Sequence, residues 1–220
     1  MLPWMLECPA CLLTEIEADT YADAWEARDP TRVPPEVPRW RFLRWLEAQG
    51  VLLHGSRDGG LTQLEPQVKD YGQPDDFSNR IGVYATSDGV WAMMYALRGP
   101  RVTGLMDMGL RQRVGDGWSA MRYFMSVGMD GSGHTDGRAL LAPGTVYALD
   151  AAGFEPSPPY CHPGLGEVQE AHWISPVAVR PLLAVPVAPT DFPLPLRVHD
   201  TAVIRERARR EPWGFPWLEP

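Results

Sequence analysis

The stretch LLHGSR, residues 52–57, places a histidine, a glycine and a serine directly after a short apolar run. A strand that ends at His54 with Gly55 behind it leaves the main chain open, so a flat ligand can reach the N–H and C=O groups there. His54 has two readings, because a histidine at a strand end either bonds a backbone carbonyl or contacts a ligand. Taken alone, the stretch favours the backbone bond.

A second stretch, GVYATSDGVWAMMY over residues 82–95, carries two tyrosines on neighbouring elements. It predicts a strand that ends at Tyr84, a turn, and a helix that carries Tyr95. The turn can fold both rings toward one cleft, where an aromatic pair can hold a planar ring. Taken singly, each tyrosine is an ordinary core residue. Together with His54 and Gly55, in this order, they favour a cleft that binds a planar ligand.

The two stretches resemble the first two motifs of the diphtheria-toxin-like branch of the ADP-ribosyltransferases, which includes the poly(ADP-ribose) polymerases. The resemblance implies that His54 hydrogen-bonds the adenine-side ribose of NAD and that the backbone of Gly55 grips the nicotinamide carboxamide. It also implies that Tyr84 and Tyr95 flank the nicotinamide ring. The whole chain, including DFPLPLRVHD over residues 191–200, further resembles bacterial proteins without an assigned function.

One position departs from the polymerase-like pattern. Those members carry a serine three residues before the second tyrosine, hydrogen-bonded to the carboxamide, and this chain has Ala92 there. Ser56, directly after the glycine, is the nearby hydroxyl that can partly take over this contact. The resemblance therefore makes Ser56 a further candidate NAD-binding residue.

The third family motif is an acidic residue at the start of a late strand. Its carboxylate suits a reaction in which positive charge develops at the anomeric carbon as nicotinamide leaves. The matching segment here is GEVQEAHWISPVAVRPLLAV, residues 166–185. Counting back from its V-A-V puts Glu170 at the family's glutamate, whereas alignment on Trp173 puts His172 there. Both side chains point to one face if the segment is extended, so both are catalytic candidates expected to line the cleft.

The resemblance covers about residues 50–186 and implies an α+β, ADP-ribosyltransferase-like split β-sandwich around a cleft. The implied function is an NAD-dependent mono-ADP-ribosyltransferase or NAD-cleaving enzyme, with NAD as substrate and a protein, nucleic acid or small molecule as acceptor. One alternative is an NAD-dependent RNA 2′-phosphotransferase, which needs a basic phosphate-binding set; Arg57, Arg80 and Arg98 are the candidates. The other is a non-catalytic module that binds NAD or a partner, in which Glu170 is structural.

The elements that must position these residues follow from hydrophobic periodicity and from glycine and proline breaks. Helices are expected over 14–28, 38–49, 87–98 and 200–210. Strands are expected over 51–54, 81–85, 102–106, 120–127, 144–149, 170–175 and 178–186. We therefore expect an N-terminal helical segment (1–50), the ADP-ribosyltransferase-like body (51–186) and a C-terminal extension with a short helix (187–220). The aromatic end of that extension, PWGFPW over 212–217, is expected to pack back on the body, with contact to a partner as the alternative.

Charge and composition narrow the classes of partner. A net charge of −8 argues against non-specific binding to a phosphate backbone. The sequence has no apolar span of about 20 residues and no basic leader, so we expect a cytoplasmic protein that does not enter a membrane. His134, in a glycine-rich stretch, is expected to be a loop residue, with a substrate contact as the alternative.

The cysteines are possible metal ligands. The chain has three, and Cys8 and Cys11 have the spacing of half a zinc site. Cys161 and His162 complete such a site only if the fold brings them back to the N-terminus. A local turn with two half-buried thiols is the favoured interpretation, so no metal is expected.

Overall fold

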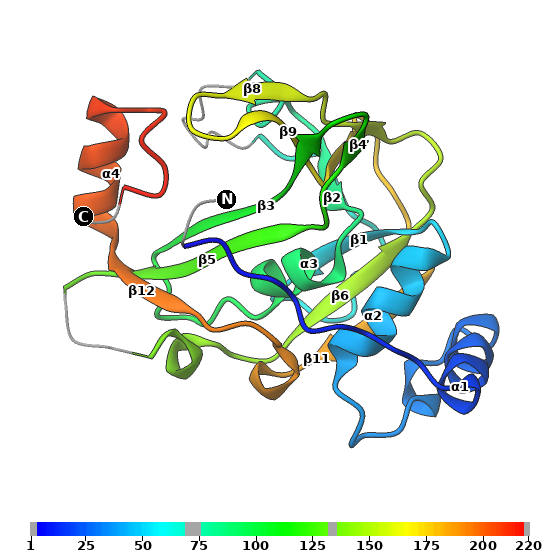
Figure 1. The fold of residues 1–220 in the computed structure, drawn as a ribbon. Coiled ribbons are helices and arrows are strands. Elements are labelled where there is room, and N and C mark those ends of the chain that lie inside the picture. The colour runs from blue at the N-terminus through cyan, green and yellow to red at the C-terminus, as the bar shows by residue number, and fades with distance from the viewer. Residues whose placement is uncertain (1–3, 69–75, 132–135, 218–220) are drawn as a thin grey trace.

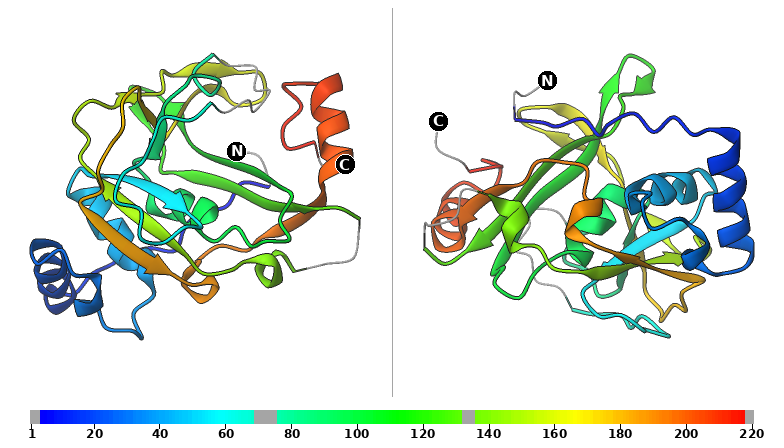
Figure 2. Two further views of the ribbon diagram at one scale, coloured as in Figure 1. Left: turned by 180° about the vertical axis from the view of Figure 1, so that it is seen from behind. Right: turned by 90° about the horizontal axis from the view of Figure 1, so that it is seen from below.

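The computed structural model describes residues 4–68, 76–131 and 136–217. Two N-terminal helices, α1 (Glu15–Glu26) and α2 (Arg39–Ala48), precede two six-stranded sheets whose arrangement is consistent with a β-sandwich (Figure 1). The predicted α+β class is confirmed. Helices α1 and α4 (Thr201–Arg210) lie at opposite ends of the molecule (Figure 2). In the described part of the chain, no helix is both long enough and apolar enough to cross a membrane.

The first sheet has the strand order β11-β6-β1-β2-β10-β7, and its paired strands are antiparallel. Its strands are β1 (Leu52–Ser56), β2 (Val83–Thr86), β6 (Gly144–Leu149), β7 (Glu155–Pro156), β10 (His172–Ser175) and β11 (Leu183–Val187). Strand β1 pairs with β6 along its whole length. With β2 it shares one paired position, Leu53 opposite Thr86. The central strands β1 and β2 therefore separate toward the end of β1.

The second sheet has the order β12-β5-β3-β9-β8, with β4 paired to β3. Its strands are β3 (Gly104–Val114), β4 (Gly117–Trp118), β5 (Arg122–Met129), β8 (Tyr160–His162), β9 (Gly166–Glu170) and β12 (Arg197–Asp200). The sheet is mixed, because β12 runs parallel to β5 whereas its other pairs are antiparallel. Short 3-10 helices cover Pro30–Arg32, Gly137–Leu140 and Pro189–Asp191.

Helix α3 (Gly89–Ala96) forms the centre of the core. Asp88 caps it by accepting a hydrogen bond from the main-chain N–H of Trp91 at 2.8 Å. Apart from Tyr95, its residues are buried, as expected for a helix that is apolar all round. The same hydrophobic cluster includes residues of α1, α2, β1 and β5. The N-terminal helices thus share one core with both sheets.

The expected helices all appear, with small shifts at their ends. Helix α1 begins with the capping box of Thr14 and Glu17, each side chain bonding the other's main chain. The apolar spacing of this helix predicts Ile16 and Ala24 as core contacts; Ala24 is fully buried, whereas Ile16 is 79% exposed. Periodicity identified an apolar position but not the face that meets the body.

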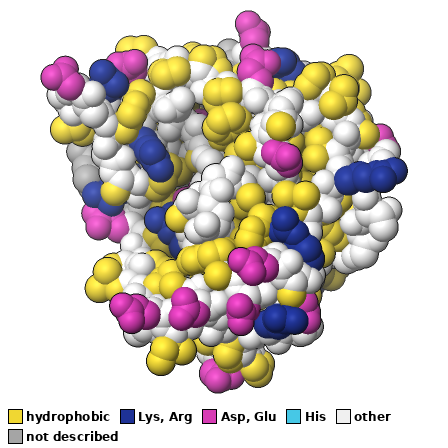
Figure 3. All heavy atoms as spheres, turned by 90° about the vertical axis from the view of Figure 1, so that its right-hand side faces the viewer, with side chains coloured by type: hydrophobic (Ala, Val, Ile, Leu, Met, Phe, Trp, Pro, Cys, Tyr) yellow, Lys and Arg dark blue, Asp and Glu magenta, His cyan; other side chains and the backbone are white. Residues whose placement is uncertain are grey.

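Figure 3 shows acidic side chains gathered over the lower part of the face where α1 lies.

Three expected strands are wrong in their bounds. The strand expected over 102–106 is β3, which runs on to Val114. The strand expected over 170–175 is two strands: β9 ends at Glu170 and β10 begins at His172, and they belong to different sheets. The strand expected over 178–186 is reduced to β11, which begins only at Leu183. Pro181 lacks a main-chain donor, which is consistent with its place outside the strand.

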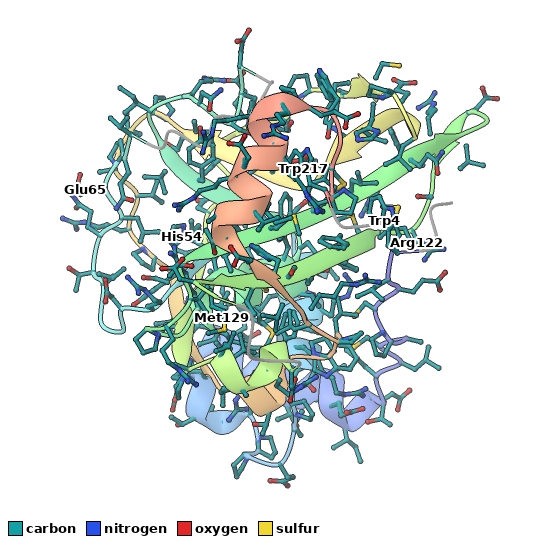
Figure 4. The ribbon with its side chains drawn as sticks, turned by 90° about the vertical axis from the view of Figure 1, so that its left-hand side faces the viewer. Trp4, His54, Glu65, Arg122, Met129 and Trp217 are labelled. Atoms are coloured by element: carbon teal, nitrogen blue, oxygen red, sulfur yellow. The ribbon has the colours of Figure 1, made fainter. Side chains whose placement is uncertain are left out.

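The C-terminal tail packs back on the body, as predicted. The ring of Phe215 lies 5.8 Å from that of Trp4 and 5.3 Å from that of Phe124, and Trp217 packs against Phe215 at 5.3 Å. Figure 4 looks onto α4 and shows the labelled Trp217 between this helix and the labelled Trp4. Trp213 is less enclosed than Phe215 and Trp217, because 43% of its surface is exposed. The tail is therefore anchored by its last two aromatic residues.

Candidate functional site

A cavity opens where β1 and β2 separate, next to α3. His54, Gly55, Tyr84 and Tyr95, all predicted to bind NAD, line it together. Its empty space, including the open mouth, is about 410 Å³. Because β1 and β2 share only the Leu53–Thr86 position, this space follows from the sheet itself. We call it the smaller cavity.

His54 is held by the main chain of the neighbouring strand. Its Nδ1 lies 2.6 Å from the carbonyl oxygen of Tyr84. A carbonyl only accepts, so Nδ1 carries the hydrogen and donates it. The imidazole bridges β1 and β2 beyond the last paired position, and it also lines the smaller cavity. The structure therefore shows the backbone bond of this histidine, and contact with a ligand in the cavity stays a prediction.

Gly55 has a packing role that the sequence did not indicate. A Cβ at this position would lie 1.9 Å from the carbonyl oxygen of Ala92 and 2.7 Å from the main-chain nitrogen of Ala96. The backbone of α3 thus packs directly on β1, which only glycine permits. Gly55 also lines the smaller cavity. The same residue therefore packs against α3 and is the one at which a ligand is expected to approach the main chain.

Tyr84 and His172 form the core of an aromatic cluster. The hydroxyl of Tyr84 donates to the carbonyl oxygens of Phe77 at 2.9 Å and Arg80 at 2.8 Å, which fixes its ring. The His172 ring lies 4.9 Å from that of Tyr84, 5.4 Å from that of Trp91 and 5.5 Å from that of Phe77. Trp91 belongs to the core cluster and lines the smaller cavity as well. A planar ligand in the smaller cavity would meet five ring-bearing side chains: His54, Tyr84, Trp91, Tyr95 and His172.

A second, larger cavity adjoins the first, since Trp91, Tyr95 and His172 line both. It extends along β3 toward α4 and the tail, where Trp213 lines it. Glu170 lies on this larger cavity, and its Oε1 accepts a hydrogen bond from the hydroxyl of Tyr160 at 2.8 Å. Glu170 therefore lines the same cavity as the rings of Trp91 and Tyr95 on α3, which we call the aromatic wall.

The two catalytic candidates reach this cavity from different sheets. The chain passes from β9 to β10 at Ala171, whose main chain donates to the carbonyl of Gly109 and accepts from the N–H of Ser87. Glu170 and His172 are both lining residues, although the single strand expected to carry them is wrong. Both residues were predicted to line one cleft, but the reason given, a single extended strand, does not hold.

Asp107, on β3, belongs to the site and was missed. Its Oδ1 accepts hydrogen bonds from the indole Nε1 of Trp91 at 2.5 Å and the hydroxyl of Tyr95 at 3.1 Å. Burial raises the pKa of its carboxyl, whereas these two bonds act in the opposite direction. The signal was present in the sequence: a lone aspartate in the apolar run GLMDMGL must find buried partners.

Of the other candidate NAD- and phosphate-binding residues that the structure describes, Arg98 alone lines one of the two cavities. Ser56 is not among the lining residues of either cavity, and its hydroxyl accepts a hydrogen bond from the N–H of Asp58 at 3.1 Å. Of the candidate phosphate-binding arginines, Arg98 lines the larger cavity and donates to the carbonyl of Val102, whereas Arg80 pairs with Glu155 on the surface. Arg57 is exposed. His134 falls outside the described residues.

The cysteines show no metal-binding arrangement. Within residues 4–68, 76–131 and 136–217, no group of three or more His, Cys, Asp or Glu side chains is placed to hold a metal ion. Cys161 and His162 therefore do not complete a site with the N-terminal pair. Burial raises the pKa of the Cys8 thiol to about 11, which disfavours the thiolate that metals bind.

Comparison of the chain with protein-family models, with curated proteins and with solved structures gave no match. The two adjoining cavities and the residues that line them are therefore the basis for assigning a function.

Proposed function

We propose that the chain binds NAD in the smaller cavity and cleaves the bond between nicotinamide and ribose, passing ADP-ribose to an acceptor or to water. The convergence of His54, Gly55, Tyr84 and Tyr95 on one cavity carries this proposal. These residues come from two strands and a helix, so their meeting is not a consequence of sequence proximity. The parting of β1 and β2 further supports the split β-sandwich that the family resemblance implies.

The bound nicotinamide ring lies between Tyr84 and Tyr95 in this proposal, with its carboxamide on the main chain of Gly55. Trp91 and His172 line the same space and add ring contacts. His54 meets the ribose on the adenine side. The orientation of the His54 ring is fixed before binding by its hydrogen bond to the Tyr84 carbonyl, which lowers the entropic cost of binding.

Glu170 stabilises the transition state from the larger cavity. The glycosidic C–N bond breaks with both electrons going to nicotinamide, which leaves as a neutral base. The acceptor forms the new bond to the anomeric carbon and loses a proton. A carboxylate near that carbon stabilises the positive charge that develops there. His172, which lines both cavities, is the alternative residue for this place.

The test is release of nicotinamide from NAD, measured by chromatography, with NAD binding measured by calorimetry. Glu170→Gln is expected to abolish release and to leave binding nearly unchanged. Tyr160→Phe is a matched variant, because it removes the hydroxyl that donates to Glu170 and keeps the ring, and a partial loss is expected. If His172→Ala abolishes release and Glu170→Gln does not, His172 holds the catalytic place. Absence of NAD binding at millimolar concentration refutes the proposal.

A non-catalytic NAD-binding module is the second candidate. The observation that favours it is the hydrogen bond from Tyr160, which gives Glu170 a structural role within the second sheet. Calorimetric binding of NAD by the wild type, without any nicotinamide released over hours, would select this candidate.

A further inference from the structure

Strand β3 carries an acidic residue on a face that, over residues 105–109, is otherwise apolar or without a side chain. Side chains alternate along a strand, so Leu105, Asp107 and Gly109 share one face. The other face, with Met106 and Met108, belongs to a separate hydrophobic cluster. The first face meets α3, because Leu105 packs against the cluster that contains this helix. A buried aspartate here is costly unless its oxygens are hydrogen-bonded.

Asp107 meets two donors from one face of α3. Trp91 and Tyr95 are one helical turn apart, and both direct their polar atoms to Oδ1 of Asp107. Gly109 completes the fit, since a Cβ there would lie 3.0 Å from two carbons of the Trp91 ring. Strand β3 therefore accommodates the indole with a glycine under the ring and a carboxylate at its nitrogen.

We propose that Asp107 is a positioning residue for the ligand site, which fixes the rings of Trp91 and Tyr95 on the wall shared by the two cavities. The role of that wall in binding NAD rests on the proposed function. Both rings line both cavities, so their orientation sets the shape of the smaller one. Trp91 is only 4% exposed, so without Asp107 its N–H would lose its partner in a buried place and the ring would have to shift.

The first measurement follows the hydrogen bond directly, without NAD. The chain has nine tryptophans, and the indole N–H signal of Trp91 in a ¹⁵N-labelled sample is the one lost in Trp91→Phe. Asp107→Ala is expected to shift this signal upfield, whereas Asp107→Asn, whose amide oxygen still accepts, is expected to leave it close to its original position. If Asp107→Ala does not fold, Asp107→Asn and Tyr95→Phe, which removes one donor, still give a result.

The second measurement asks whether the fixed rings matter for the ligand. Asp107→Ala is expected to raise the Kd for NAD, and the KM for nicotinamide release, about tenfold, because a charged hydrogen-bond acceptor is lost. The loss in kcat is expected to be smaller. Asp107→Asn is expected to restore both values to within about threefold of the wild type, because it keeps the acceptor without the charge.

The outcomes separate the two proposals. An indole signal that does not move in Asp107→Ala refutes the hold on Trp91, whatever NAD does. If Asp107→Asn binds NAD like the wild type but releases no nicotinamide, the carboxylate acts through its charge or as a proton acceptor, and the positioning role is wrong. If the Asp107 variants show the expected indole shifts but the wild type does not bind NAD, only the proposed ligand is refuted.

Discussion

The imidazole Nδ1 of His54 and the carbonyl oxygen of Tyr84 lie 2.6 Å apart, across the place where β1 and β2 part. A side chain here takes the place of a main-chain bond between the strands. This contact fixes the proton on Nδ1 and holds the ring at the edge of the smaller cavity. A structural bond and a place in the candidate site are therefore properties of one side chain, and they can be separated by substitution.

His54→Asn is expected to separate them. An asparagine amide donates like Nδ1, so this variant keeps the bond to Tyr84 but removes the rest of the imidazole. His54→Ala is expected to lose about 1 kcal/mol of unfolding free energy and the binding of NAD. His54→Asn should recover the stability in urea unfolding but not the binding in calorimetry. If His54→Asn binds NAD as the wild type does, the imidazole contributes only the structural bond.

Gly55→Ala is expected to destabilise the fold strongly. The new Cβ would lie 1.9 Å from the Ala92 carbonyl, so α3 must move away from β1. Overpacking against a backbone that cannot yield costs about 3 kcal/mol. Gly59→Ala is the matched control, because the nearest atom to its Cβ is at an ordinary 3.5 Å, and a change within about 0.5 kcal/mol is expected. Equal midpoints in urea unfolding would contradict the close packing.

The parts of the site that the sequence predicted are those fixed by local structure. His54 lies within β1, and Tyr84 and Tyr95 flank one strand-to-helix turn, so short-range patterns suffice to place them. The crossing at Ala171 depends instead on pairing with distant strands, because β9 pairs with β3 and β10 pairs with β2. Asp107 likewise finds its partners through the packing of α3 on β3. Periodicity carries no information about such contacts.

Cys8 and Cys161 are expected to differ in their rates of alkylation. Cys161 is exposed, whereas burial raises the pKa of the Cys8 thiol to about 11. At pH 8 only about 0.1% of Cys8 is then thiolate, the reactive form. Iodoacetamide at pH 8 should therefore label Cys161 first and Cys8 last, as measured by mass spectrometry of peptides over time. Urea should abolish the difference; equal rates in the folded protein would show that the N-terminal segment does not bury Cys8.

A buried ionic cluster caps α3, which carries the aromatic wall of the site. Glu47 on α2 accepts from the N–H of Gly89, and Arg44 bridges it to Asp88 at 2.8 and 3.3 Å. Asp88 also accepts from the hydroxyl of Tyr123 at 2.5 Å. Because Asp88 accepts hydrogen bonds from more donors than Glu47 does, the negative charge is more stable on Asp88. Burial, and then the charge of Asp88, raises the pKa of Glu47 well above its usual 4.5.

This pKa gives stability a defined dependence on pH. Above pH 4.5 the unfolded chain releases the Glu47 proton while the folded protein keeps it, so the free energy of unfolding falls as pH rises toward the folded-state pKa. The slope from one group reaches about 1.4 kcal/mol per pH unit. Glu47→Gln stays neutral and keeps an acceptor for Gly89, so urea unfolding between pH 5 and 8 should show a flatter profile. Glu36→Gln, at an exposed position, should follow the wild type. A wild-type profile as flat as that of Glu47→Gln would mean that Glu47 is ionised in the folded protein, with Arg44 compensating the charge of both carboxylates.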